Sequence, residues 1–149
     1  MEDAKEEIRK KKKDCWIESS FSIEALAVRE DVVKNSLSKH VNDMSKINGV
    51  YIYETSFSDI IKVTKPLKGV DEAYSQITHV KFFVKDIMTL VSMAMTFGPS
   101  SVEILGPDKK EIKISEIQNM INLISGVVHQ FAAAGVGGIV ITPEKGQTA

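Results

Sequence analysis

The three histidines are the side chains of this sequence best suited to proton transfer or metal binding. They are His40, His79 and His129. None has a second histidine, a cysteine or an acid nearby at the spacing of zinc ligands. We therefore predict packing or surface roles for all three, and we expect no metal site and no cofactor.

Three glutamates on predicted strands, Glu18, Glu24 and Glu103, have the chemistry of general acids and bases. On a half-exposed strand such side chains are usually solvated. A catalytic pair would require a shared buried cleft with strongly shifted pKa values. The spacing of these residues gives no sign of one, so we expect no catalytic residue and no enzymatic activity.

The serines and the single cysteine offer nucleophiles without a visible base. Ser100 and Ser101 follow Gly98-Pro99 between a predicted helix and a predicted strand. A nucleophile elbow needs the reverse order, strand then helix, so we expect a turn and a strand start here. Cys15 follows a basic run that could lower its pKa. No partner base is identifiable, so an incidental or structural thiol is favoured.

The N-terminal segment carries the one basic cluster. Its candidate nucleic-acid contacts are Arg9, Lys10, Lys11, Lys12 and Lys13. Such a run can bind RNA or DNA through phosphates. The neighbouring acids nearly balance it, and no interleaved aromatic side chains suggest base stacking. A solvated charged helix or arm and a nucleic-acid arm both remain open.

The C-terminal segment is small and apolar. The glycines at 135, 137 and 138 follow a predicted helix and lack the Lys-Ser/Thr of a phosphate loop. Its candidate partner-binding residues are Val136, Ile139, Val140 and Ile141. They could add as a strand to a partner's sheet, or dock onto their own domain.

Composition predicts an ordinary globular domain. The chain has 149 residues, 43% hydrophobic and 26% charged, with a net charge of −1, so no strong field favours nucleic acid or membrane. One cysteine excludes an internal disulfide. We see no signal peptide, and no apolar run approaches the ~20 residues of a membrane span. We expect a cytoplasmic protein.

Periodicity predicts the first half of the fold. Residues 17–27 alternate as a half-buried strand, and 30–47 form a helix that Asn48-Gly49 ends. Residues 50–63 read as one strand that presents Tyr51, Phe57 and Ile61 on one face, with a bulge or bend at 56–59.

The second half adds two strands and two helices. A strand over 74–84 precedes an apolar helix that begins after an Asp86 cap and ends at Gly98-Pro99. A short strand, 102–105, precedes a last helix, 116–131, with Ser115 and Gln118 as a capping box.

This order predicts an α+β fold. It is the ferredoxin-like βαββαβ arrangement, a four-stranded antiparallel sheet with helices on one face. An N-terminal charged helix or arm and a C-terminal helix and tail complete it. We assign residues 1–14 to the arm, 15–131 to a single domain and 132–149 to the tail.

Two stretches resemble a family of small archaeal proteins of uncharacterised function. They run from Cys15 through Trp-Ile-Glu to Leu26, and from Phe97 through Pro-Ser-Ser-Val-Glu-Ile to Pro107. Residues 80–107 also resemble the ferredoxin-like C-terminal extension of WYL-type regulators. Both resemblances imply the fold, and neither implies a site residue.

The leading functional hypothesis is a non-enzymatic module that self-associates, as a dimer, and binds a protein or ribonucleoprotein partner. One alternative is an RNA- or ribosome-associated protein that uses the basic run. Another is a small-molecule sensor of the ACT type. Such sensors place a glycine in the loop after the first strand, and residues 28–31 here contain none.

Overall fold

The computed structural model describes residues 2–135 of the chain. The chain divides into two compact units, Met1–Glu111 and Ile112–Ala149. The first unit contains α1 (Glu2–Lys13), β1 (Ile17–Ala27), α2 (Glu30–Ser45), β2 (Val50–Phe57), β3 (Ile61–Leu67), β4 (Val70–Val84), α3 (Ile87–Phe97) and β5 (Ser101–Gly106). The second unit contains α4 (Ile114–Ala133). The predicted domain boundaries at 14/15 and 131/132 stay predictions.

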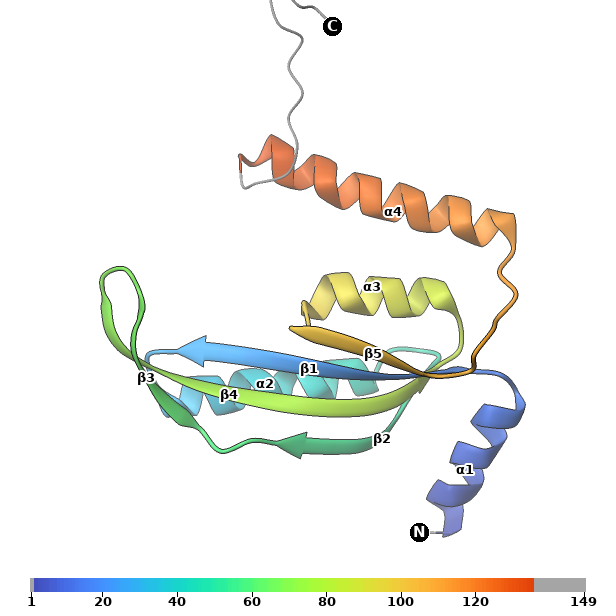
Figure 1. Ribbon diagram of the computed structural model, residues 1–149, viewed down its shortest axis with the longest axis horizontal. Coiled ribbons are helices and arrows are strands. Elements are labelled where there is room, and N and C mark those ends of the chain that lie inside the picture. Colours follow the sequence, from blue (N-terminus) through green and yellow to red (C-terminus); the bar gives the residue numbers. More distant parts are fainter. Residues whose placement is uncertain (1, 136–149) are drawn as a thin grey trace, which may run out of the picture. The chain divides into compact units, whose positions relative to one another are not determined.

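All strand pairs of the sheet are antiparallel (Figure 1). The order is β2-β4-β1-β5, and β3 pairs with the opposite end of β4 from β2. The α+β class is therefore confirmed, but the sheet has five strands rather than the predicted four. The bounds of β1 are those predicted from its alternation.

The predicted strand over 50–63 is two strands, because the chain leaves the sheet after Phe57 and returns at Ile61. The pairing of β2 with β4 also shifts between Ile52 and Glu54. An extra residue of this kind turns the following side chains to the other face. Tyr51 therefore pairs with Phe83, whereas Phe57 pairs with Thr78, which points to the opposite face. The prediction that Tyr51 and Phe57 share a face is wrong.

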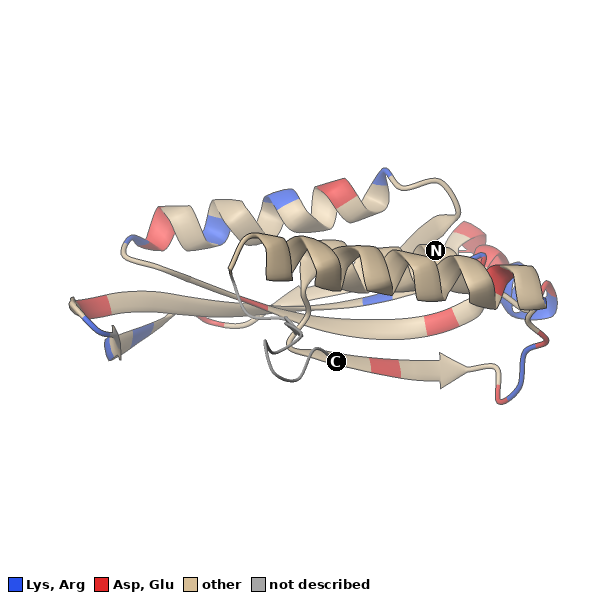
Figure 2. Cartoon of the chain, turned by 90° about the horizontal axis from the view of Figure 1, so that it is seen from above, with Lys and Arg blue, Asp and Glu red and all other residues tan. Residues whose placement is uncertain are grey.

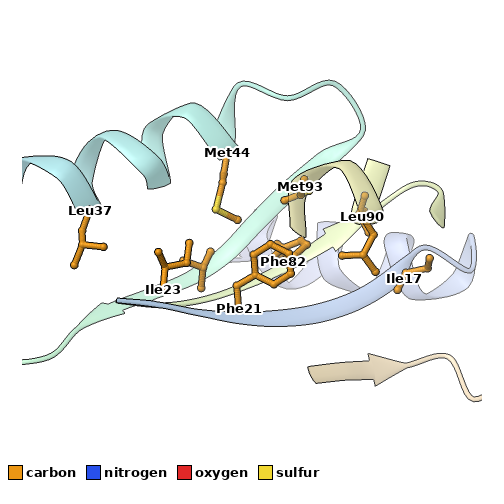
Figure 3. Close-up of a cluster of buried hydrophobic side chains, with 10 residues drawn as sticks. Ile17, Phe21, Ile23, Leu37, Met44, Phe82, Leu90 and Met93 are labelled. Carbon is orange, nitrogen blue, oxygen red and sulfur yellow. The ribbon is translucent and has the colours of Figure 1, made fainter. Parts of the chain in front are cut away.

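The hydrophobic core lies between one face of the sheet and helices α2 and α3 (Figure 3). Leu37 and Met44 of α2 and Met93 of α3 pack there against side chains of β1 and β4. At its centre, the rings of Phe21 and Phe82 meet edge to face with centroids 4.9 Å apart. This geometry is the favourable one for two aromatic rings. We call the opposite face of the sheet, which neither helix covers, the open face.

The ends of α3 follow the predicted signals. The Asp86 side chain accepts a hydrogen bond from the Thr89 backbone N–H at 2.8 Å, and Gly98 ends the helix with a φ of 53°.

The predicted capping box of the last helix is wrong, because α4 begins at Ile114 after Lys113, and no side chain caps it. Ser115 therefore lies inside the helix, where its hydroxyl cannot act as the cap.

Residues 2–13, predicted as a helix or an arm, form helix α1 in the structure. It ends in a closed turn, since the backbone N–H of Cys15 bonds to Lys12 O at 3.1 Å and that of Trp16 to Lys11 O at 3.0 Å. Cys15 has a φ of 58°. This pattern is the Schellman motif, with Cys15 at the left-handed position that glycine usually occupies. The exposed cysteine thus has a backbone role.

Candidate interaction surfaces

The end of α1 is held against the open face of the sheet by Lys11. Its ammonium group lies 4.3 Å from the ring centroid of Trp16 and 5.7 Å from that of Tyr51. Glu7 pairs with the same ammonium at 3.1 Å. Only 16% of the Lys11 side chain is exposed, against 59% for Lys12. A partly desolvated cation on two aromatic rings contributes more than an exposed one, so Lys11 is the main anchor of α1.

Beside this anchor, Glu18 and Tyr53 form a polar pair on the open face. The Tyr53 hydroxyl donates a hydrogen bond of 2.5 Å to Glu18 Oε2, and the Tyr53 ring lies 5.2 Å from that of Phe83. Burial, and then the hydrogen bond to Glu18, raise the pKa of the Tyr53 hydroxyl well above its usual range. The tyrosine therefore stays protonated as a donor and is unsuited to act as a base near neutral pH.

A cleft of about 280 Å³ opens next to this pair. It is lined by Lys12, Trp16, Glu18, Phe83, Leu105, Gly106 and Pro107. Of the three glutamates considered for acid–base chemistry, this cleft contains Glu18. Glu24 is exposed and accepts a hydrogen bond from Ser75, and Glu103 is exposed on β5. The structure does not bring these carboxylates together as a catalytic pair.

The basic run of α1 makes contacts within its own chain. Arg9 pairs with Glu6 at 3.4 Å, Lys11 with Glu7, and Lys12 lies 4.0 Å from Glu18. Lys10 and Lys13 are exposed. Three of the five candidate nucleic-acid residues thus have an acid beside them, which weakens their attraction for phosphate. The nucleic-acid hypothesis stays a prediction.

The histidines occupy three unrelated places. His40 of α2 packs edge to face on Phe97 of α3, with centroids 5.8 Å apart. The Nδ1 atom of His79 lies 2.8 Å from Ser22 Oγ, and His129 is exposed on α4. Among residues 2–135, no group of three or more His, Cys, Asp or Glu side chains could hold a metal ion.

Ser100 and Ser101 occupy a turn and the start of a strand, as predicted. The backbone N–H and the hydroxyl of Ser100 both donate to Ser22 O, at 2.7 and 3.1 Å. Ser101 is the first residue of β5. Ser100 therefore joins the start of β5 to β1 through two hydrogen bonds.

A shallow depression of about 600 Å³ surrounds the loop between β1 and α2. It is the loop at which a sensor of the ACT type would bind its ligand. Here the Arg29 guanidinium makes two hydrogen bonds, of 3.0 and 2.7 Å, to the carboxylate of Asp31. The lining also contains Lys34 and Glu30, so its two cations are balanced by two acids, which leaves little net charge to attract an anionic ligand.

Strand β5 forms an exposed edge of the sheet. Within the described residues, β5 pairs with β1 on one side and with no strand on the other. Val102, Ile104 and Leu105 are 47%, 54% and 41% exposed. Protected edges usually carry lysine, proline or a covering helix. An apolar edge with one charged residue, Glu103, can instead accept another strand.

In the second unit, α4 presents an unburied apolar surface. Its 20 residues include a stripe of isoleucine, valine and phenylalanine side chains, and within its unit none of them is buried. Figure 2 shows that most of this helix, which leads into the grey trace, has no charged residue. Helix surfaces of this composition are normally covered in a folded assembly.

The contacts of Trp16, Tyr51 and Tyr53 on the open face were not predicted from the sequence. The visible signals were Trp16 directly after the lysine run and two tyrosines on one strand, β2. The pairing of β1 and β2 with β4 was needed to bring them together. The candidate partner-binding residues Val136, Ile139, Val140 and Ile141 lie outside the described part of the chain, so their role stays a prediction. No helix within residues 2–135 is both long enough and apolar enough to cross a membrane.

Comparison with known proteins places the chain in a family but finds no individual relative. Neither the curated proteins nor the solved structures gave a match. The likeness of residues 80–107 to WYL-type regulators therefore stays a prediction. The model of the MJ0538 family, which is named for an archaeal protein, matches residues 18–147. This match spans the sheet, α2, α3 and α4, and the chain accordingly belongs to the MJ0538 family.

Proposed function

We propose that this chain is a non-enzymatic module that self-associates and binds a macromolecular partner. The observation that carries the proposal is the apolar surface of α4, none of whose residues is buried within its unit. The exposed apolar edge of β5 supports it independently. Burial of such surfaces in an assembly is favourable, by roughly 25 cal/mol per Å² of apolar area removed from water.

The ferredoxin-like assignment is part of this proposal. If β2 and β3 are counted as one interrupted strand, β4 lies between β1 and β2, and β1 lies between β4 and β5. Each βαβ half then encloses a strand of the other half, which supports the split βαβ arrangement. Sheets of this kind leave one face and two edges for partners, an inference from fold analogy.

Self-association is tested by light scattering of the full chain over a wide range of concentrations. We expect the mass to exceed 16.5 kDa, the mass of the chain, and to fall on dilution. A mass that stays at the monomer value throughout would disprove this half of the proposal.

Partner binding is tested with the full chain as bait for affinity purification from its native host. The variant Ile104→Lys places a charge on the edge of β5, and Val28→Lys places the same charge on an exposed loop residue as a control. We expect Ile104→Lys to lose the partner that the wild type and Val28→Lys retain, because an edge lysine opposes strand addition. Equal recovery with all three baits would contradict the role of β5.

A further inference from the structure

The apolar residues of α4 follow a heptad repeat. They alternate in spacing between three and four residues, as Ile114, Ile117, Ile121, Ile124, Val128 and Phe131. In heptad notation, 114, 121 and 128 are a positions, and 117, 124 and 131 are d positions. We call these six residues the α4 seam. An a/d repeat is typical of a helix that packs along another helix, and Met120 and Val127 widen the apolar surface of α4 beside the seam.

The composition of α4 makes packing of its apolar face necessary. Four isoleucines and two valines lose side-chain freedom in a helix, and Gly126 lowers its propensity further. A helix of this kind gains most of its stability from packing of its apolar face. Within its own unit, α4 buries none of that face.

The residues that flank the seam indicate what the partner is. In coiled coils, charges at the e and g positions select a different partner or an orientation. Within α4 those positions hold Gln118, Met120, Ser125, Val127 and Ala132, and the single Asp, Glu, Lys or Arg residue of the helix, Glu116, lies at a c position. Two copies of α4 can therefore approach without like-charge repulsion at these positions. No pattern of charges disfavours the pairing of α4 with an identical helix.

We infer that the α4 seam pairs with the α4 seam of a second copy of this chain. The inference rests on the proposed self-association and identifies the surface through which the two copies associate. The β-branched residues at all three a positions and the apolar d positions supply the knobs of this interface. The edge of β5 then remains available for a different macromolecular partner.

The test uses the full chain with a charge placed on or off the seam. Ile121→Glu lies on the seam, and Asn119→Glu introduces the same residue on the opposite side of the same helix. We expect Ile121→Glu to raise the dissociation constant of self-association by more than about tenfold, because a carboxylate would be desolvated there. We expect Asn119→Glu to keep the wild-type mass in light scattering.

Cross-linking provides a second measurement that does not depend on loss of assembly. In a Cys15→Ser background, Ile121→Cys and Asn119→Cys each supply one thiol in the chain. A short bis-maleimide should join two copies of the Ile121→Cys chain and far fewer of the Asn119→Cys chain. Equal cross-linking at the two positions, or an oligomer whose mass Ile121→Glu leaves unchanged, would overturn the α4 contact while the proposed self-association stands. A monomeric wild type would instead remove both.

Discussion

Helices α3 and α4 are both apolar, yet they differ in what surrounds them. Helix α3 has no charged residue and buries Leu90 and Met93 in the core of the first unit. Helix α4 is almost twice as long, with 20 residues against 11, and buries none within its unit. An apolar helix pattern thus predicts that a partner exists without saying whether the partner belongs to the same unit. For α3 it is the sheet, and for α4 we propose a second copy.

Truncation of one methionine in each helix tests the difference in burial between α3 and α4 with the largest expected effect. Met93 of α3 is 1% exposed, and we expect Met93→Ala to lower the free energy of unfolding by about 2–5 kcal/mol through the cavity it leaves. Met120 of α4 is partly exposed. We expect Met120→Ala to cost less than about 1 kcal/mol in denaturant unfolding at a concentration where the chain is monomeric. Similar losses at both positions would contradict the contrast.

The first unit also pairs polar groups internally, since the Tyr53 hydroxyl donates a hydrogen bond to the Glu18 carboxylate. We expect Tyr53→Phe to lower the free energy of unfolding by about 1.5 kcal/mol, because it removes a hydrogen bond to a charged group. Tyr53 keeps its proton in the folded chain, whereas in the unfolded chain it ionises near its ordinary pKa of 10.0.

The sign of the pH effect follows from this difference. A raised pKa in the folded state contributes stability below pH 10.0, and that contribution is lost as the pH rises further. Urea unfolding from pH 7 upward should therefore show a steeper decline above pH 10 for the wild type than for Tyr53→Phe. Parallel profiles would show that the Tyr53 hydroxyl has no such role.

Helices α3 and α4 also differ at their N-terminal ends, where α3 has a side-chain cap and α4 has none. Asp86 caps α3 through Thr89, and we expect Asp86→Ala to cost about 1 kcal/mol of unfolding free energy. Lys113 precedes α4 without a side-chain cap. Lys113→Asp should supply one and raise the helical signal in circular dichroism. A loss of helicity in Lys113→Asp would show that α4 does not begin at Ile114.

The C-terminal ends should give the smallest effects, with opposite signs. Cys15 and Gly98 end α1 and α3 with φ angles of 58° and 53°. A glycine adopts this conformation without strain, whereas a residue with a Cβ does not. Cys15→Gly should raise the free energy of unfolding by up to about 1 kcal/mol, and Gly98→Ala should lower it by about 1 kcal/mol. Thermal unfolding measures both, and a destabilised Cys15→Gly would contradict the cap assignment.

Local signals in the sequence were sufficient for several elements of this protein. The alternation of residues 17–27 gave β1, and the pair of Asp86 and Gly98 gave both ends of α3. The stripe over 116–131 identified α4 within two residues at each end. These features could be predicted because each depends on neighbours within a few positions along the chain.

Only the tertiary structure decided the features that depend on strand pairing. The break between Phe57 and Ile61 and the register shift after Ile52 follow from how β4 pairs along its 15 residues. That pairing also places Tyr53 beside Glu18, 35 positions away in the sequence. Periodicity describes one element at a time, so it cannot show which distant side chains share a face. For the same reason it identified the stripe of α4 but not the unit to which that helix belongs.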